Sequence, residues 1–178
     1  ADAGLETKSP DFMKQLVAEV THLARRSPEI SQRSGVSVRV TICNYENLLS
    51  SALKRALRLG EAVAVPRVSD LAAISASTGG KIELESLGES TEDKVLAKIM
   101  QRALLNVFNR SFGSGELDDV VGAFQDGLKI EVSDTMPSEA YLRHLGQVRP
   151  LQTAVRKLGA QDPATVAAAV EFVLEGLH

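Results

Sequence analysis

Apolar residues recur every three to four positions in several stretches of this chain, which is the spacing of one face of an α-helix. The pattern is strongest over residues 9–26, 36–59, 91–110 and 163–177. Aromatic residues make up only 4 % of the chain and Trp is absent, so the core must consist of aliphatic side chains. Such a core suits packed helices better than a β-sandwich. The sequence therefore predicts a mainly α fold.

The second of these stretches requires a choice between strand and helix. Its start, residues 36–42, is rich in β-branched residues and alternates like a strand. The helical stripe that begins there continues to Ala56, however, and Gly60 is a typical helix stop. We therefore expect one helix from about Val36 to Leu59.

The first helix is expected to begin at Ser9-Pro10, with Ser as the N-cap and Pro in the first turn, and to end near Arg26. Weaker patterns predict further short helices and two extended pieces. The short helices are expected over residues 68–74, 118–124 and 138–145, and the extended pieces over residues 81–85 and 128–132.

The composition changes most sharply at residues 86–90, where Ser, Gly and Glu interrupt the apolar pattern. Stretches of this kind are typical of domain boundaries. We therefore predict two parts, a helical domain over residues 9–85 and a helical C-terminal extension over residues 91–178.

Charge and cysteine content exclude several classes of function. The net charge is −3 with acids and bases interspersed, which argues against a dedicated nucleic-acid binder. Cys43 is the single cysteine, so an intramolecular disulfide and a multi-thiolate zinc site are excluded, and we interpret it as a small core or boundary residue. His22, His144 and His178 lack ligand spacing. Without an apolar run of about 18–20 residues or a signal-peptide pattern, we expect no membrane span and a cytoplasmic location.

The usual catalytic motifs are absent from the sequence. It contains no phosphate loop of the form G-x-x-x-x-G-K-[ST], no G-x-S-x-G, no H-E-x-x-H and no C-x-x-C. Residues 78–81, Thr-Gly-Gly-Lys, lack the glycine spacing of a phosphate loop, and we interpret them as a turn. The chain alone is therefore expected to be catalytically inactive.

Two arginines, Arg33 and Arg39, lie at the start of the second predicted helix, and residues 31–45 contain no acid. A helix N-terminus has free N–H groups and a partial positive charge, so arginine there is unfavourable by a few tenths of a kcal/mol, roughly, unless an anion compensates. The combination suits an anion site, in particular for a polyphosphate. The alternative is that Arg39 pairs with Glu29 or Glu46, or reaches solvent.

The segment Gly35-Val-Ser-Val-Arg39, after the connector Arg26-Ser-Pro-Glu-Ile, resembles the sensor-2 segment of AAA+ lid domains. The likeness is to the magnesium-chelatase ATPase subunit and the MoxR group, and it covers about residues 9–85. In those families the arginine of this segment begins a lid helix and reaches the γ-phosphate of ATP across a domain or subunit boundary. The resemblance implies that Arg39 is the sensor-2 arginine and that Arg33 is a second candidate for the same pocket.

The resemblance also implies an AAA+ lid-type helical bundle over residues 9–85, followed by a second helical region with minor β structure. ATP and Mg²⁺ would bind in the parent protein, held by an upstream AAA+ core domain that carries the Walker motifs. The parent would form a homo-oligomeric ring and remodel an unidentified protein substrate. The chain would then be the non-catalytic C-terminal portion, sensing ATP and coupling its hydrolysis to remodelling.

Two other functions stay open on the sequence. The chain could be a free-standing helical protein-interaction module. It could also be a small DNA-associated regulator that uses the basic cluster Lys54, Arg55 and Arg58 at one helix end, although the acidic net charge disfavours nucleic acid as a partner.

Overall fold

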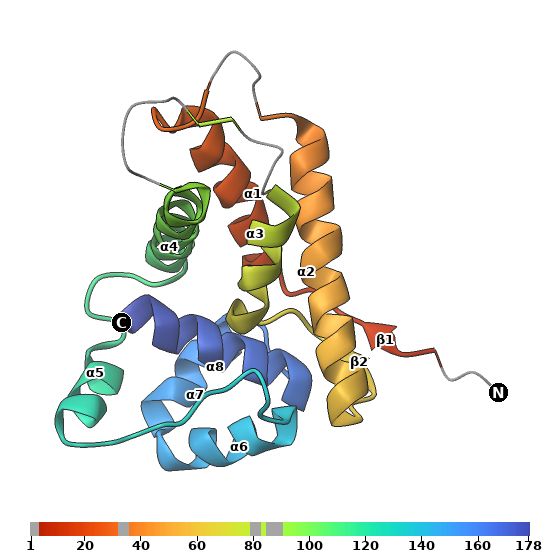
Figure 1. Cartoon of the computed structure of the whole chain (residues 1–178). Coiled ribbons are helices and arrows are strands. Elements are labelled where there is room, and N and C mark those ends of the chain that lie inside the picture. The colour runs from red at the N-terminus through yellow and green to blue at the C-terminus, as the bar shows by residue number, and fades with distance from the viewer. Residues whose placement is uncertain (1–3, 32–35, 79–82, 85–90) are drawn as a thin grey trace.

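The computed structural model describes residues 4–31, 36–78, 83–84 and 91–178, and it is mainly helical, as the sequence predicts (Figure 1). The described elements, in chain order, are β1 (Glu6–Thr7), α1 (Asp11–Arg26), α2 (Val38–Leu59), β2 (Val63–Ala64), the 3₁₀ helix η1 (Val68–Leu71), α3 (Ala72–Thr78), α4 (Glu92–Ser111), α5 (Asp118–Gln125), α6 (Ser138–Gln147), α7 (Arg149–Lys157) and α8 (Pro163–Leu177).

The long helices begin and end near the residues that the sequence indicates. Gly60 adopts the left-handed conformation, with φ of 68°, and its N–H bonds to the carbonyls at the end of α2, which stops that helix. Asp162 caps α8, because its carboxylate accepts the N–H groups of Ala164 and Thr165 at 3.1 Å each. The region of residues 38–42 is helical, which confirms the choice of helix over strand there.

The minor β structure differs from the prediction. The expected strand over residues 128–132 is wrong, because none of these residues pairs with another described strand and a strand needs a neighbour for its N–H and C=O groups. A two-stranded parallel sheet, which was not predicted, instead joins β1 to β2. Of the extended piece expected over residues 81–85, only 83–84 are described, and Leu84 forms an isolated bridge with Ile30.

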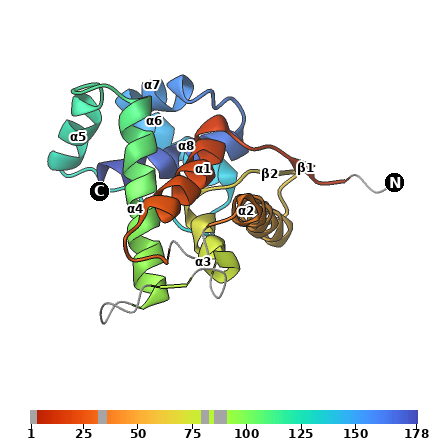
Figure 2. The ribbon, with the colours of Figure 1, turned by 90° about the horizontal axis from the view of Figure 1, so that it is seen from above.

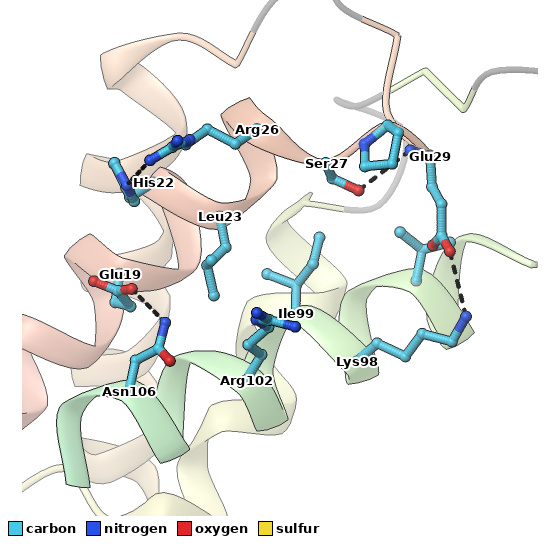
Figure 3. A pocket seen from close by; sticks show the side chains of 12 residues that line it. Glu19, His22, Leu23, Arg26, Ser27, Glu29, Lys98, Ile99, Arg102 and Asn106 are labelled. Carbon is cyan, nitrogen blue, oxygen red and sulfur yellow. Dashed lines mark hydrogen bonds and ion pairs between the residues drawn. The ribbon is translucent and has the colours of Figure 1, made fainter. Parts of the chain in front are cut away.

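Helix α1 lies at the centre of the N-terminal half, with α4 on one side and α2 on the other (Figure 2). Glu19 of α1 contacts Asn106 in the second half of α4, and Glu29, just beyond the end of α1, contacts Lys98 in the first half of α4 (Figure 3). The two helices therefore run antiparallel. Helices α6 and α7 pack against α8, and α8 in turn packs against α4.

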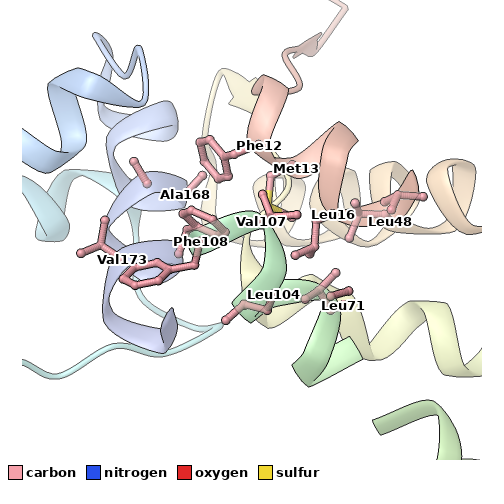
Figure 4. Packing of buried hydrophobic residues seen from close by; sticks show 14 of the residues in the cluster. Phe12, Met13, Leu16, Leu48, Leu71, Leu104, Val107, Phe108, Ala168 and Val173 are labelled. Atoms are coloured by element: carbon pink, nitrogen blue, oxygen red, sulfur yellow. The ribbon is translucent and has the colours of Figure 1, made fainter. Parts of the chain in front are cut away.

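One hydrophobic core joins the two halves of the chain (Figure 4). Phe12 of α1 lies against Phe172 of α8, with ring centroids 4.8 Å apart, and Phe172 also contacts Phe108 of α4. The predicted boundary at residues 86–90 lies outside the described residues, so the division into two domains stays a prediction. The described side chains before and after it share this core.

None of the helices in the described part of the chain is long and apolar enough to cross a membrane.

Candidate functional site

Arg39 lies in the first turn of α2 and its side chain is exposed. The first turn of this helix contains no acidic residue, and the N-cap residue Ser37 makes no side-chain hydrogen bond to the helix within the described part of the chain. The partial positive charge of the helix N-terminus is therefore not offset by a neighbouring carboxylate on the same turn. This end of α2 presents backbone N–H groups and a guanidinium together.

The first turn of α2 is fixed against α1 by contacts on its buried side. Val36 and Val40 are buried in the core. Arg25 Nε donates to the carbonyl oxygen of Val36 at 2.8 Å, and the Thr41 hydroxyl donates to the Thr21 hydroxyl at 3.0 Å. These bonds determine which face of the helix points outward, and the arginine of the first turn lies on the exposed side.

The two acids considered as partners of Arg39 do not pair with it. Glu29 instead accepts a hydrogen bond from Lys98 at 3.3 Å, and Glu46 is exposed. None of the ion pairs found among the described residues includes Arg39, so its guanidinium reaches solvent without a carboxylate partner. Arg33, the second predicted residue of this site, lies outside the described residues.

Four large apolar side chains of α2 are exposed, and we call them the outer α2 face. They are Val38, Ile42, Leu53 and Leu57, with exposed fractions of 65 %, 53 %, 37 % and 65 %. They form two pairs, one toward each end of the helix, with the exposed polar residues Glu46 and Ser50 between them. Apolar side chains that gather on an exposed surface are a feature of contact sites. The outer α2 face therefore has the character of a contact surface.

The basic cluster predicted at the end of α2 does not exist as a surface patch. Arg55 is only 4 % exposed, and its Nη2 donates to Asp70 Oδ2 at 2.8 Å and to the carbonyl oxygen of Val65 at 2.7 Å. Lys54 and Arg58 are exposed, and Arg58 bonds to the backbone of residue 134. The prediction of one basic surface cluster is therefore wrong, because Arg55 is buried. This removes the feature that favoured a DNA-associated regulator.

Arg55 belongs instead to a set of charged side chains that the sequence did not reveal. We call this set the buried ionic cluster, and it comprises Arg55, Glu61, Arg67, Asp70 and Glu171. It joins α2, the segment around η1, and α8. Four of its residues lie within residues 55–70, but they follow no motif spacing, and Glu171 is far from them in sequence, so no spacing pattern could indicate the cluster. The only signal was an arginine, Arg67, within an otherwise apolar stretch.

Arg67 is the centre of the buried ionic cluster and is fully buried. Its guanidinium donates to the Met136 carbonyl at 2.8 Å and to the Ser138 hydroxyl at 2.7 Å, and it lies 4.9 Å from the centre of the Tyr141 ring. Burial, followed by the charge of Arg55, lowers the pKa of Arg67 from its ordinary value. The paired carboxylates oppose this shift, and they keep the cation in place.

Tyr141 completes the contacts of the buried ionic cluster with α8. Its hydroxyl donates to Glu171 Oε1 at 2.6 Å. Burial, and then the neighbouring carboxylate charge, raise the pKa of Tyr141 well above its ordinary value, so the phenol stays protonated as a donor. The cluster connects helices through hydrogen bonds and ion pairs, although Arg55 Nε, Arg67 Nε and Glu61 Oε2 are buried without a hydrogen-bond partner among the described residues. It offers no nucleophile paired with a base.

Of the Thr-Gly-Gly-Lys segment over residues 78–81, the structure describes only Thr78. Thr78 belongs to α3, and its buried hydroxyl donates to Asn44 Oδ1 at 2.9 Å, while residues 79–81 lie outside the described residues. The described residues include no group of His, Cys, Asp and Glu side chains that could hold a metal ion.

Comparison of the chain with protein-family models, curated proteins and solved structures gives no match. The functional interpretation therefore depends on the segment Gly35-Val-Ser-Val-Arg39 and on the geometry of the N-terminal end of α2.

Proposed function

We propose that this chain is the non-catalytic C-terminal portion of a cytoplasmic, magnesium-chelatase-like AAA+ ATPase, with α1, α2, η1 and α3 as its lid. In the parent protein, Arg39 contacts the terminal phosphate of ATP held by an upstream core domain. The observation that carries this proposal is an exposed arginine in the first turn of a 22-residue helix, with no carboxylate partner among the described residues.

The charge arrangement at this helix end favours a phosphate ligand. Arg39 adds a full positive charge to a terminus that already carries about half a charge, and an anion is needed to offset both. A guanidinium binds phosphate oxygens through two parallel N–H bonds, which a lysine cannot do. ATP, with its Mg²⁺ held by the core, supplies such an anion in the parent. Arg39 and the first-turn amides would then stabilise negative charge on its terminal phosphate.

The outer α2 face supports the presence of a covering domain next to Arg39. Val38 and Ile42 flank the arginine along the helix, and both are more than half exposed. Packing of the upstream core, or of the neighbouring subunit in a ring, against this face would bury them. Loss of the phosphate contact after hydrolysis would then release the lid and pass the motion to the partner protein.

The test is ATP hydrolysis by the full-length parent protein, comparing the wild type with Arg39→Ala and Arg39→Lys. Loss of one preorganised donor to a developing charge lowers kcat by about a hundredfold, so we expect a loss of that order for Ala and a smaller one for Lys. Arg143→Ala, which removes an exposed arginine from α6, is the matched control and should hydrolyse ATP like the wild type.

Ring assembly of each variant is measured by light scattering, so that a loss of hydrolysis is not confused with a loss of the oligomer. Unchanged hydrolysis in Arg39→Ala with the ring intact would contradict the proposal. A parent protein without an ATPase core would contradict it as well.

A free-standing helical protein-interaction module is the second candidate, and the outer α2 face favours it. In that function, Ile42→Asp would abolish binding of the partner protein, whereas Arg39→Ala would leave it unchanged. In the lid function, both changes would reduce ATP hydrolysis by the parent.

A further inference from the structure

A groove of about 670 Å³ lies between α1 and α4, and Arg39 is not among the residues that line it (Figure 3). Its size is within the range of ligand-binding clefts. We call it the α1–α4 groove. The apolar side chains of Leu23 and Ile99 point into it from opposite helices, and His22, Arg26 and Arg102 lie along its edges.

The acids of the α1–α4 groove already have partners. Glu19 accepts hydrogen bonds from Asn106 Nδ2 at 2.8 Å and Arg110 Nη2 at 3.0 Å, and Glu29 accepts one from Lys98 at 3.3 Å. Burial by itself would raise the pKa of Glu19, but the two hydrogen bonds outweigh it, and the pKa lies below its ordinary value. Glu19 therefore stays charged, and both carboxylates are paired, one toward each end of the groove.

Between these two polar contacts the groove carries positive charge without an acid to balance it. Arg26 makes a hydrogen bond of 3.4 Å to His22, and this contact does not neutralise it. Arg102 is exposed, and none of the ion pairs among the described residues includes either arginine. The groove thus places two cations beside an apolar floor, and a complementary ligand would combine carboxylates with an apolar side chain.

We propose that the α1–α4 groove binds an acidic segment of a partner protein. An apolar side chain of that segment contacts Leu23 and Ile99, and its carboxylates pair with Arg26 and Arg102. This inference does not depend on the function proposed for Arg39.

The chemistry of the groove favours a peptide over a nucleic acid. Single-stranded nucleic acids bind through aromatic side chains that stack on the bases, and the described lining residues include no Phe, Tyr or Trp and a single histidine, His22. A peptide can also place its own backbone N–H groups beside the carboxylates of Glu19 and Glu29, whereas a phosphodiester backbone has no N–H donor to place there.

The experiment measures fluorescence anisotropy of a labelled ten-residue peptide that alternates Asp or Glu with Leu, titrated with the 178-residue chain. The control peptide carries Asn and Gln in place of the acids. Arg26→Glu and Arg102→Glu should each weaken binding about tenfold, because each replaces an attraction by a repulsion. The control variant Arg143→Glu, on α6, should bind like the wild type. Higher salt should weaken binding of the acidic peptide.

Three results would overturn the proposal. The acidic peptide could fail to bind or bind no better than its neutral analogue, or both charge reversals could leave its affinity unchanged. An oligonucleotide of equal charge could bind more tightly and lose affinity in the same two variants, which would assign the groove to nucleic acid. Circular dichroism of each variant checks that the fold is retained.

Discussion

Replacing Arg67 with Met should destabilise the fold by about 3–5 kcal/mol, because it leaves buried carboxylates without their cation. The guanidinium donates to Met136, Ser138 and Glu61 at 2.8, 2.7 and 3.3 Å. Without it the carbonyl of Met136 loses its donor, Glu171 keeps uncompensated charge, and of its described ion pairs Glu61 keeps only the one with Arg55 at 3.6 Å. Since small proteins have a total stability of about 5–15 kcal/mol, this loss is a large fraction of it.

Urea unfolding followed by circular dichroism measures this loss. With a slope of about 2–3 kcal/mol per molar urea, the midpoint should fall by about 1.5 M. Glu171→Gln removes a charge of the buried ionic cluster while keeping an acceptor for the Tyr141 hydroxyl. The double variant should lose less than the sum of the single changes by about 1–3 kcal/mol, because the second change removes the carboxylate that the first one orphans.

A loss of less than about 1 kcal/mol in Arg67→Met, or additivity of the two changes within about 0.5 kcal/mol, would contradict the stabilising role of Arg67. Arg143→Met, at an exposed position of α6, is the control and should change the stability by no more than about 0.5 kcal/mol.

Two further predictions concern stability. A Cβ at Gly176 would overlap the ring of Phe108, so Gly176→Ala should cost about 1–3 kcal/mol in urea unfolding, whereas Gly122→Ala, in α5 with open space around it, should stabilise by about 0.5–1 kcal/mol. Asp162→Ala should cost about 1 kcal/mol at pH 7 by removing the cap of α8. Burial would raise the pKa of Asp162, but the backbone N–H of Thr165 and a nearby lysine hold it below its ordinary value of 3.8. The stability that the charged Asp162 cap contributes is therefore complete above pH 3.8 and is lost as the pH falls below that value. The difference in free energy of unfolding between the wild type and Asp162→Ala should shrink there. An equal loss of stability in Gly176→Ala and Gly122→Ala, or an effect of Asp162→Ala on stability that does not change with pH, would contradict these assignments.

The long helices could be predicted because their buried residues repeat at a fixed spacing. In α2 an apolar repeat at helical spacing continues past the β-branched start and outweighs it, although the structure buries Val40, Leu48, Ala52 and Ala56 and leaves Ile42 and Leu53 of the predicted stripe exposed. Gly60 then ends the helix through a conformation that other residues adopt at a cost. Local sequence determines such elements, so the sequence alone reveals them.

Elements that depend on distant partners could not be predicted in the same way. Strands β1 and β2 are two residues long, too short for a periodic pattern, and they exist because residues far apart in sequence meet. Residues 128–132 show the reverse case, an alternating pattern without a partner strand. Helix α7 was missed because its polar composition conceals a short buried row of Leu151, Ala154 and Val155.

The candidate site residues show the same difference between local and distant signals in the sequence. Arg39 was found from its position in a local segment, and the structure places it exposed at the start of α2. Arg55 looked like a surface cation because its helix face could not be inferred from neighbouring charges alone. Its partner Asp70 is 15 residues away, and only the folded chain brings the two together.

Contact of Arg39 with ATP can be measured by hydrogen–deuterium exchange of the full-length parent, with and without a non-hydrolysable ATP analogue at saturation. We expect that the analogue slows exchange of the amides of residues 38–42, and that Arg39→Ala removes this protection while the analogue stays bound to the core. Exchange at these amides that is unaffected by the analogue, or equally slowed in Arg39→Ala, would contradict a contact of Arg39 with ATP.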